Sequence, residues 1–202
     1  MPPETDQASL PGIPTAQPTD RLFFAVMPAA VTAERIAALA LDLRERLTLR
    51  GRLRPTTHLH VTLHYLGDFA GVPRQLVETA CAAAAGVAMA PFEARFDHVA
   101  SFAGRPGKHP FVLLENTANG LAQLHAQLGA RLAEAGLLRR ERAFVPHLTL
   151  LYDALTVERQ PVEPLAWPVR EFVLIHSLLG RTEYRVLGRW LLDADSARPT
   201  RN

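Results

Sequence analysis

The sequence predicts an α+β fold in which helices pack outside curved, mostly antiparallel sheets. Segments with helical and with strand periodicity alternate in the order β-α-β-α-β-β-α-β-β-β. The turn Gly104-Arg-Pro-Gly107 between two apolar segments predicts a hairpin. No long linker divides the chain after residue 20, so two lobes sharing one cleft fit the pattern better than separable domains.

The first half of the chain begins with a short apolar strand over 21–27 that Pro28 stops. Apolar residues at helical spacing predict a helix over 32–49. Alternation predicts a strand over 58–66. A second helix is predicted over 73–87, with Pro73 in its first turn, where the missing N–H does no harm.

The second half starts with the hairpin strands, predicted over 92–102 and 111–115. A third helix is predicted over 118–136 because leucines recur on one face, at positions 121, 124, 128 and 132. Three further strands are predicted over 147–152, 169–179 and 184–193.

Composition limits the class of protein. Residues 1–20 hold five prolines and no basic residue, which predicts a disordered tail rather than a secretory signal. We expect one domain over 21–195 and a second tail over 196–202. No apolar run reaches the roughly 18 residues of a membrane span. The lone Cys81 excludes an internal disulfide and favours the cytosol.

The formal net charge of +2 gives no strong global field for nucleic acid. Among the 22 basic residues only Lys108 is a lysine. Arginine matches phosphate oxygens with two parallel hydrogen bonds. The bias is also what GC-rich codon usage produces, so it supports a phosphate ligand only weakly.

Two short segments carry the chemistry. Leu59-His60-Val-Thr62-Leu and Pro146-His147-Leu-Thr149-Leu both contain histidine, an aliphatic residue, threonine and leucine. No other of the eight histidines has Ser or Thr two places on followed by an aliphatic residue. Side chains at i and i+2 of a strand project from one face, about 6 to 7 Å apart. Each strand therefore presents an imidazole and a hydroxyl together.

Two such strands facing one cleft would surround a phosphate with two imidazoles and two hydroxyls. One neutral histidine can accept a proton from water while a protonated one donates to the departing ribose oxygen. The threonine hydroxyls can bind the non-bridging oxygens as charge develops. This chemistry needs no metal or other cofactor.

Other interpretations of these histidines stay open. A single histidine on a strand is more often structural than catalytic, and the repetition argues against that. A metal site is a second alternative, because alternation puts His58, His60 and His64 on one strand face. Zinc sites of this kind usually need a carboxylate or cysteine nearby, and none is evident.

The paired tetrads resemble the two-histidine phosphoesterase superfamily, and their flanks resemble its bacterial RNA 2′,3′-cyclic phosphodiesterase branch, also called 2′-5′ RNA ligase. The similar segments are Arg21-Leu-Phe-Phe-Ala-Val, Leu59-His-Val-Thr-Leu-His-Tyr-Leu-Gly67, Arg142-Ala-Phe-Val-Pro-His-Leu-Thr-Leu-Leu and Gly180-Arg-Thr-Glu-Tyr-Arg-Val-Leu-Gly-Arg-Trp190. The resemblance implies a bilobal, pseudo-twofold fold with one tetrad in each lobe.

It also implies roles. His60 would be the proton donor, leaving a 2′-phosphate, and His147 the proton acceptor. Thr62 and Thr149 would hold the phosphate. Arg142 matches a basic position of the second motif, although a plain surface arginine is as good an explanation.

Two positions depart from the family pattern. Many relatives carry a basic residue where this chain has Tyr152, so phosphate binding would be weaker unless Arg142 or Arg181 compensates; Tyr152 could instead stack on a base. Relatives tend to have a small residue at His64. On the face of His60, His64 could contact RNA or make protonation of His60 costlier.

We therefore expect a cytosolic, monomeric enzyme that opens 2′,3′-cyclic phosphates at RNA 3′ ends, with reverse 2′-5′ ligation minor. One alternative is the same chemistry on a small cyclic nucleotide. Another is an RNA- or nucleotide-binding module without turnover.

Overall fold

The computed structural model describes residues 17–115, 120–138 and 143–193. Within them, eight strands form one antiparallel sheet in the order β6-β3-β4-β5-β2-β1-β7-β8. The strands are β1 (Asp20–Val26), β2 (Val61–Phe69), β3 (Phe92–Ser101), β4 (His109–Glu115), β5 (His147–Asp153), β6 (Gln160–Val169), β7 (Glu171–Leu178) and β8 (Glu183–Leu191). The helices are α1 (Ala30–Arg46), α2 (Arg74–Ala85) and α3 (Gly120–Glu134), with a 3₁₀ turn η1 (Thr56–His58).

The sheet consists of two four-stranded halves joined by a narrow seam. Strands β2 and β5 are paired only at Val61 and Leu148, whereas every other neighbouring pair is matched over five or more positions. Reversing the strand order exchanges β2 with β5, β1 with β4, β7 with β3 and β8 with β6. Helices α1 and α3 occupy matching places, between β1 and β2 and between β4 and β5. The bilobal, pseudo-symmetric α+β fold expected from the sequence is confirmed.

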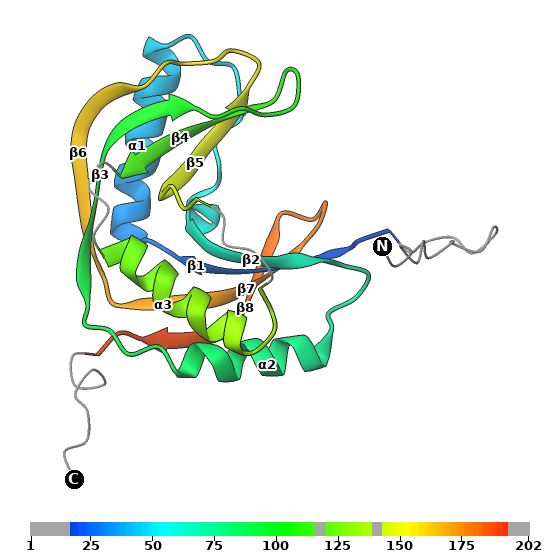
Figure 1. Ribbon diagram of the computed structural model, residues 1–202. Helices are drawn as coiled ribbons and strands as arrows, with labels where there is room; N and C mark the ends of the chain where they lie inside the picture. Colours follow the sequence, from blue (N-terminus) through cyan, green and yellow to red (C-terminus); the bar gives the residue numbers. More distant parts are fainter. Residues whose placement is uncertain (1–16, 116–119, 139–142, 194–202) are drawn as a thin grey trace, which may run out of the picture.

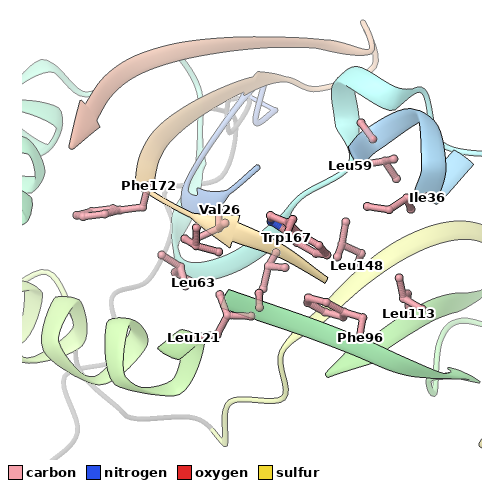
Figure 2. Close-up of a cluster of buried hydrophobic side chains, with 14 of the residues drawn as sticks. Val26, Ile36, Leu59, Leu63, Phe96, Leu113, Leu121, Leu148, Trp167 and Phe172 are labelled. Carbon is pink, nitrogen blue, oxygen red and sulfur yellow. The ribbon is translucent and has the colours of Figure 1, made fainter. Parts of the chain in front are cut away.

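One large apolar core lies between the sheet and the helices. Helix α3 contributes the predicted leucine face, and Leu121, Leu124, Leu128 and Leu132 are all fully buried. Figure 2 shows Ile36 of α1 in the same group of buried side chains as Leu113 and Leu148, and Figure 1 shows α1 along the half that contains β4 and β5. The tetrad residues Val61, Leu63, Leu148 and Leu150 belong to this core. Burying the aliphatic positions on the helix side leaves the alternate positions on the opposite face.

Strand β6 was not predicted. It contains Pro161, Pro164 and Pro168, which argue against a strand because proline donates no ladder hydrogen bond. The prolines are compatible with a strand here because β6 is an edge strand that pairs only with β3. Edge strands tolerate proline on their outward side.

Several predicted boundaries were also wrong. Helix α1 ends at Arg46 rather than near 49, where Thr48 takes a positive φ of 55°. The strand predicted from 58 begins at Val61, because His58 closes the 3₁₀ turn η1. Asp20, assigned to the tail, is the first residue of β1. Of the expected tails, residues 1–16 and 196–202 lie outside the described residues.

Asp20 links β1 to the loop after β2 and to β7, within the half of the sheet that contains β2, β1, β7 and β8. Its carboxylate accepts hydrogen bonds from the Thr19 hydroxyl at 2.5 Å, from the Gly71 amide at 3.0 Å and from Nε2 of His176 at 2.5 Å. Asp20 and His176 are both buried. The hydrogen bond from Thr19, followed by that from His176, lowers the pKa of Asp20 below its usual value.

We predict that Asp20→Ala lowers the urea midpoint of unfolding at pH 7 by about 0.5–1 M, since it leaves the His176 ring and the Gly71 amide without their acceptor. The pKa of Asp20 is lower in the folded state, so its stabilisation is present above the unfolded pKa of about 3.9 and is lost as the pH falls through the folded pKa. Urea unfolding at pH 7 and pH 3 measures both effects.

Asp42→Ala is the matched control. Asp42 makes an exposed pair with Arg46 one turn away on α1, and its loss should change the urea midpoint by about 0.2 M or less. Equal losses for the two variants would contradict the role given to Asp20.

Candidate active site

The two tetrads meet at the seam. Antiparallel continuation from the Val61–Leu148 pair sets Thr62 opposite His147 and His60 opposite Thr149. All four residues line one cavity of about 890 Å³ on the face of the sheet away from the core. The pairing that joins the two halves thus also brings together residues 87 positions apart in the chain.

The two histidines are held in matching ways. Nδ1 of His60 donates to the carbonyl of His58 at 2.7 Å, and Nδ1 of His147 donates to the carbonyl of Val145 at 2.7 Å. Because a carbonyl only accepts, Nδ1 carries the proton in both rings. Nε2 of each ring is therefore the atom available to exchange a proton with a ligand.

An aromatic ring supports each imidazole from its own half of the sheet. The ring of Phe23 on β1 lies 4.9 Å from that of His60, and the ring of Phe102, just after β3, lies 4.9 Å from that of His147. Tyr184 packs edge-on against His60 at 5.7 Å. These contacts fix the ring orientations that the carbonyl hydrogen bonds begin to define.

A β-bulge at the last residue of each tetrad overturns the prediction for His64. In β2 the partners of Ala25 and Phe24 are Thr62 and His64, so Leu63 is the extra residue. A bulge shifts the alternation by one residue. His64 therefore faces α3, where its Nε2 donates to the carbonyl of His125 at 2.8 Å, and it does not share the face of His60.

The same bulge occurs in β5, where Leu150 is the extra residue. In both strands the bulge turns the next tyrosine toward the cavity, namely Tyr65 in β2 and Tyr152 in β5. Tyr152, which the sequence singled out as a departure, is thus a lining residue of the site.

The cavity wall is basic. Its lining includes Arg21, Arg54, Arg105 and Lys108, and none of the described lining residues is acidic. Arg21 is paired with Asp68 at 2.7 Å. The ammonium of Lys108 lies 5.4 Å over the ring of Tyr152. The hairpin between β3 and β4 therefore brings a cation next to Tyr152, the position at which the family resemblance implies a basic residue.

Arg54 is held in the cavity by the loop that follows α1. The carboxylate of Asp153 accepts hydrogen bonds from the backbone amides of Arg50 and Gly51, each at 2.6 Å. The Arg54 amide donates to the carbonyl of Leu150 at 2.8 Å. Its guanidinium contacts the Tyr184 hydroxyl, whose pKa is raised by burial.

Sequence reasoning missed Arg54, Lys108, Arg105, Phe23 and Tyr184 as site residues. Tyr184 and Phe23 lay in segments quoted for the resemblance, while the basic residues had no local motif. Neither Arg142 nor Arg181, the compensating cations proposed from the sequence, is among the described residues that line the cavity. Arg142 lies outside the described residues, and the neighbours Gly180 and Thr182 line the cavity whereas Arg181 does not.

Electrostatics distinguish His60. Burial, followed by the nearby charges of Arg54 and His147, lowers the pKa of His60 to about 4, although its hydrogen bond to the His58 carbonyl opposes the shift. In the free protein at neutral pH, His60 is therefore uncharged.

Within the described ranges, no three His, Cys, Asp or Glu side chains group as ligands for a metal ion. The set proposed from the sequence is separated, since His64 faces α3 while His58 and His60 line the cavity. Cys81 lies on α2 and does not line this cavity. No helix in the described part of the chain is long and apolar enough to cross a membrane.

Known proteins resemble this chain in both sequence and fold. The model of the 2′-5′ RNA ligase superfamily matches residues 27–181. An Escherichia coli K12 protein named RNA 2′,3′-cyclic phosphodiesterase is 31% identical over 178 residues, covering 85% of this chain and 96% of that protein.

Solved structures agree. Escherichia coli LigT in complex with 3′-AMP superposes with a TM-score of 0.68 at 28% identity, over 87% of this chain and 99% of that one. A protein from Thermus thermophilus superposes with a TM-score of 0.67 at 26% identity, over 85% of this chain and 97% of that one.

We predict that His60 in the free protein titrates near pH 4, and not near the ordinary imidazole value of about 6.5. Below that pH the ring is charged and above it neutral. NMR of the protein labelled with ¹³C-histidine measures the titration, with His60→Gln to assign the signal. A midpoint above pH 6 in protein whose circular dichroism is unchanged would contradict the burial of this ring.

Proposed function

The chain belongs to the 2′-5′ RNA ligase superfamily, and on that premise we propose that it hydrolyses 2′,3′-cyclic phosphates at RNA 3′ ends to 2′-phosphates by metal-independent acid–base catalysis. The observation that carries the proposal is the matched pair of imidazoles. Both are oriented through Nδ1 by a carbonyl two residues earlier, and both line one cavity with two threonines and a basic wall.

In the proposed reaction, Nε2 of His147 takes a proton from water as the water oxygen attacks phosphorus. The bond from phosphorus to the ribose 3′-oxygen breaks, and the proton on Nε2 of His60 passes to that oxygen. The phosphate remains on the 2′-oxygen. General acid and general base on opposite sides of the phosphorus are what an in-line displacement requires.

His60 must carry a proton to act as the acid, yet its pKa in the free protein is about 4. An anionic phosphodiester in the cavity favours the charged imidazole and opposes the burial cost. The substrate thus helps to protonate its own acid, which ties proton donation to occupancy of the site.

In this proposal the threonines and the cations bind the phosphate together. Hydroxyls of Thr62 and Thr149 donate to the non-bridging oxygens at the centre of the cavity, and Arg54, Arg105 and Lys108 add charge around it. Lys108 supplies the cation that Tyr152 does not. We further propose that the protein is a monomer and that it works in the cytosol. The single cysteine favours that compartment.

Two alternatives remain distinct in experiment. A small cyclic nucleotide as the true substrate would be turned over at least as fast as an oligonucleotide. A binding module would hold RNA tightly without cleaving it, although a complete pair of oriented imidazoles argues for turnover.

We predict that the protein opens a short RNA ending in a 2′,3′-cyclic phosphate in excess EDTA and leaves a 2′-phosphate. His60→Ala and His147→Ala should each lose activity about 100-fold or more, the loss expected of a missing acid or base. Chromatography of the digested product maps the phosphate to the 2′ or 3′ oxygen.

His98→Ala is the matched control, because His98 lies on β3 of the same sheet and does not line the cavity. It should keep near wild-type activity. Activity abolished by EDTA, or no activity on this RNA, would overturn the proposed mechanism.

We predict that joining the same cyclic phosphate end to a 5′-hydroxyl RNA is minor beside hydrolysis. Water is the abundant nucleophile in an open basic cavity. Both products can be quantified from one labelled RNA in a single reaction. Ligation in excess of hydrolysis would contradict this prediction.

A further inference from the structure

A second cavity, of about 910 Å³, adjoins the proposed phosphate site. Both cavities share Thr62, Tyr65 and His147 as lining residues. The second cavity extends from there toward α3, which contributes Gly129, Ala130 and Ala133. A molecule whose phosphate sits between the tetrads therefore has direct access to this space.

The described residues that line this second cavity include several aromatic rings and no charged side chain. The ring of His125 lies 4.1 Å from that of His64 and 4.1 Å from that of Phe144, with interplanar angles of 20° and 9°. The three rings thus form one continuous stack. The described lining residues include no Arg, Lys, Asp or Glu. Burial, followed by the neighbouring His64, lowers the pKa of His125 to about 4, so this ring is neutral at physiological pH.

In the phosphate cavity the tyrosine rings already have partners. The Arg21 guanidinium lies 5.6 Å over the ring of Tyr65, and Lys108 lies 5.4 Å over that of Tyr152. The Tyr184 ring packs 4.2 Å from that of His58. A planar, neutral ligand group would therefore find its stacking surface in the second cavity.

We propose that the cavity beside α3 binds the nucleobase of the nucleotide that carries the cyclic phosphate, an inference that rests on the proposed function. Apolar walls with aromatic rings suit a flat heterocycle, and base stacking on aromatic side chains tolerates every base. The volume far exceeds one base, so we expect little discrimination between purines and pyrimidines.

The test compares two substrates, adenosine 2′,3′-cyclic phosphate and methyl β-D-ribofuranoside 2′,3′-cyclic phosphate, which lacks the base. The wild-type protein should favour the nucleotide in kcat/KM by about 10-fold or more, the scale of one stacked base. Uridine 2′,3′-cyclic phosphate should lie within a few-fold of the adenosine compound.

Two variants locate the effect. Ala133→Trp fills the cavity from α3, and Phe144→Ala removes one ring of the stack; each should bring the ratio of the two kcat/KM values toward one. Ala135→Trp, just past the end of α3 and outside both cavities, should keep the wild-type ratio. If Ala133→Trp fails to fold, Phe144→Ala still tests the stack.

The outcomes separate the two proposals. Equal kcat/KM for the two substrates in the wild type, or a wild-type ratio in Phe144→Ala, would overturn the nucleobase site while hydrolysis stands. Hydrolysis of neither compound would overturn the proposed function and this inference with it.

Discussion

The site depends on the single backbone pairing between Val61 and Leu148. Antiparallel strands that paired along their full length would close the sheet and leave no room for a ligand between its halves. Here β2 and β5 pair only at the second residue of each tetrad, Val61 and Leu148, and the two strands are unpaired on either side. The pairing therefore sets the distance and mutual orientation of two imidazoles and two hydroxyls, while the divergence beside it makes room for substrate.

Pseudo-twofold symmetry explains why such precision is available from an ordinary sheet. Each half supplies the same parts: a carbonyl two residues before the histidine, an aromatic ring beside it, a threonine two residues after it, and a bulge on the following leucine. The difference between the proposed acid and the proposed base then arises from their surroundings. Burial and the charge of Arg54 lower the pKa of His60, whose ring also packs against Tyr184.

The two cavities differ in chemistry: one is lined by cations and the other by stacked neutral rings. Cations gather around the tetrads, where a phosphate would sit, and they also cover two of the tyrosine rings there. Neutral rings gather beside α3, where charge is absent from the described lining. The bulge after Thr62 creates this division, because it sends His64 into the stack with His125 and turns Tyr65 toward the phosphate cavity.

The sequence by itself determined the fold class and most of the elements, and it singled out His60, Thr62, His147 and Thr149 as candidate site residues, because periodicity and a repeated motif are local properties of the chain. It did not determine β6, whose prolines are compatible with a strand only at the edge of a sheet. It misplaced His64, since alternation holds only until a bulge interrupts it. Only the tertiary structure brought Arg54 and Lys108 to the site, because a loop held by Asp153 and a hairpin tip become neighbours of the tetrads through folding alone.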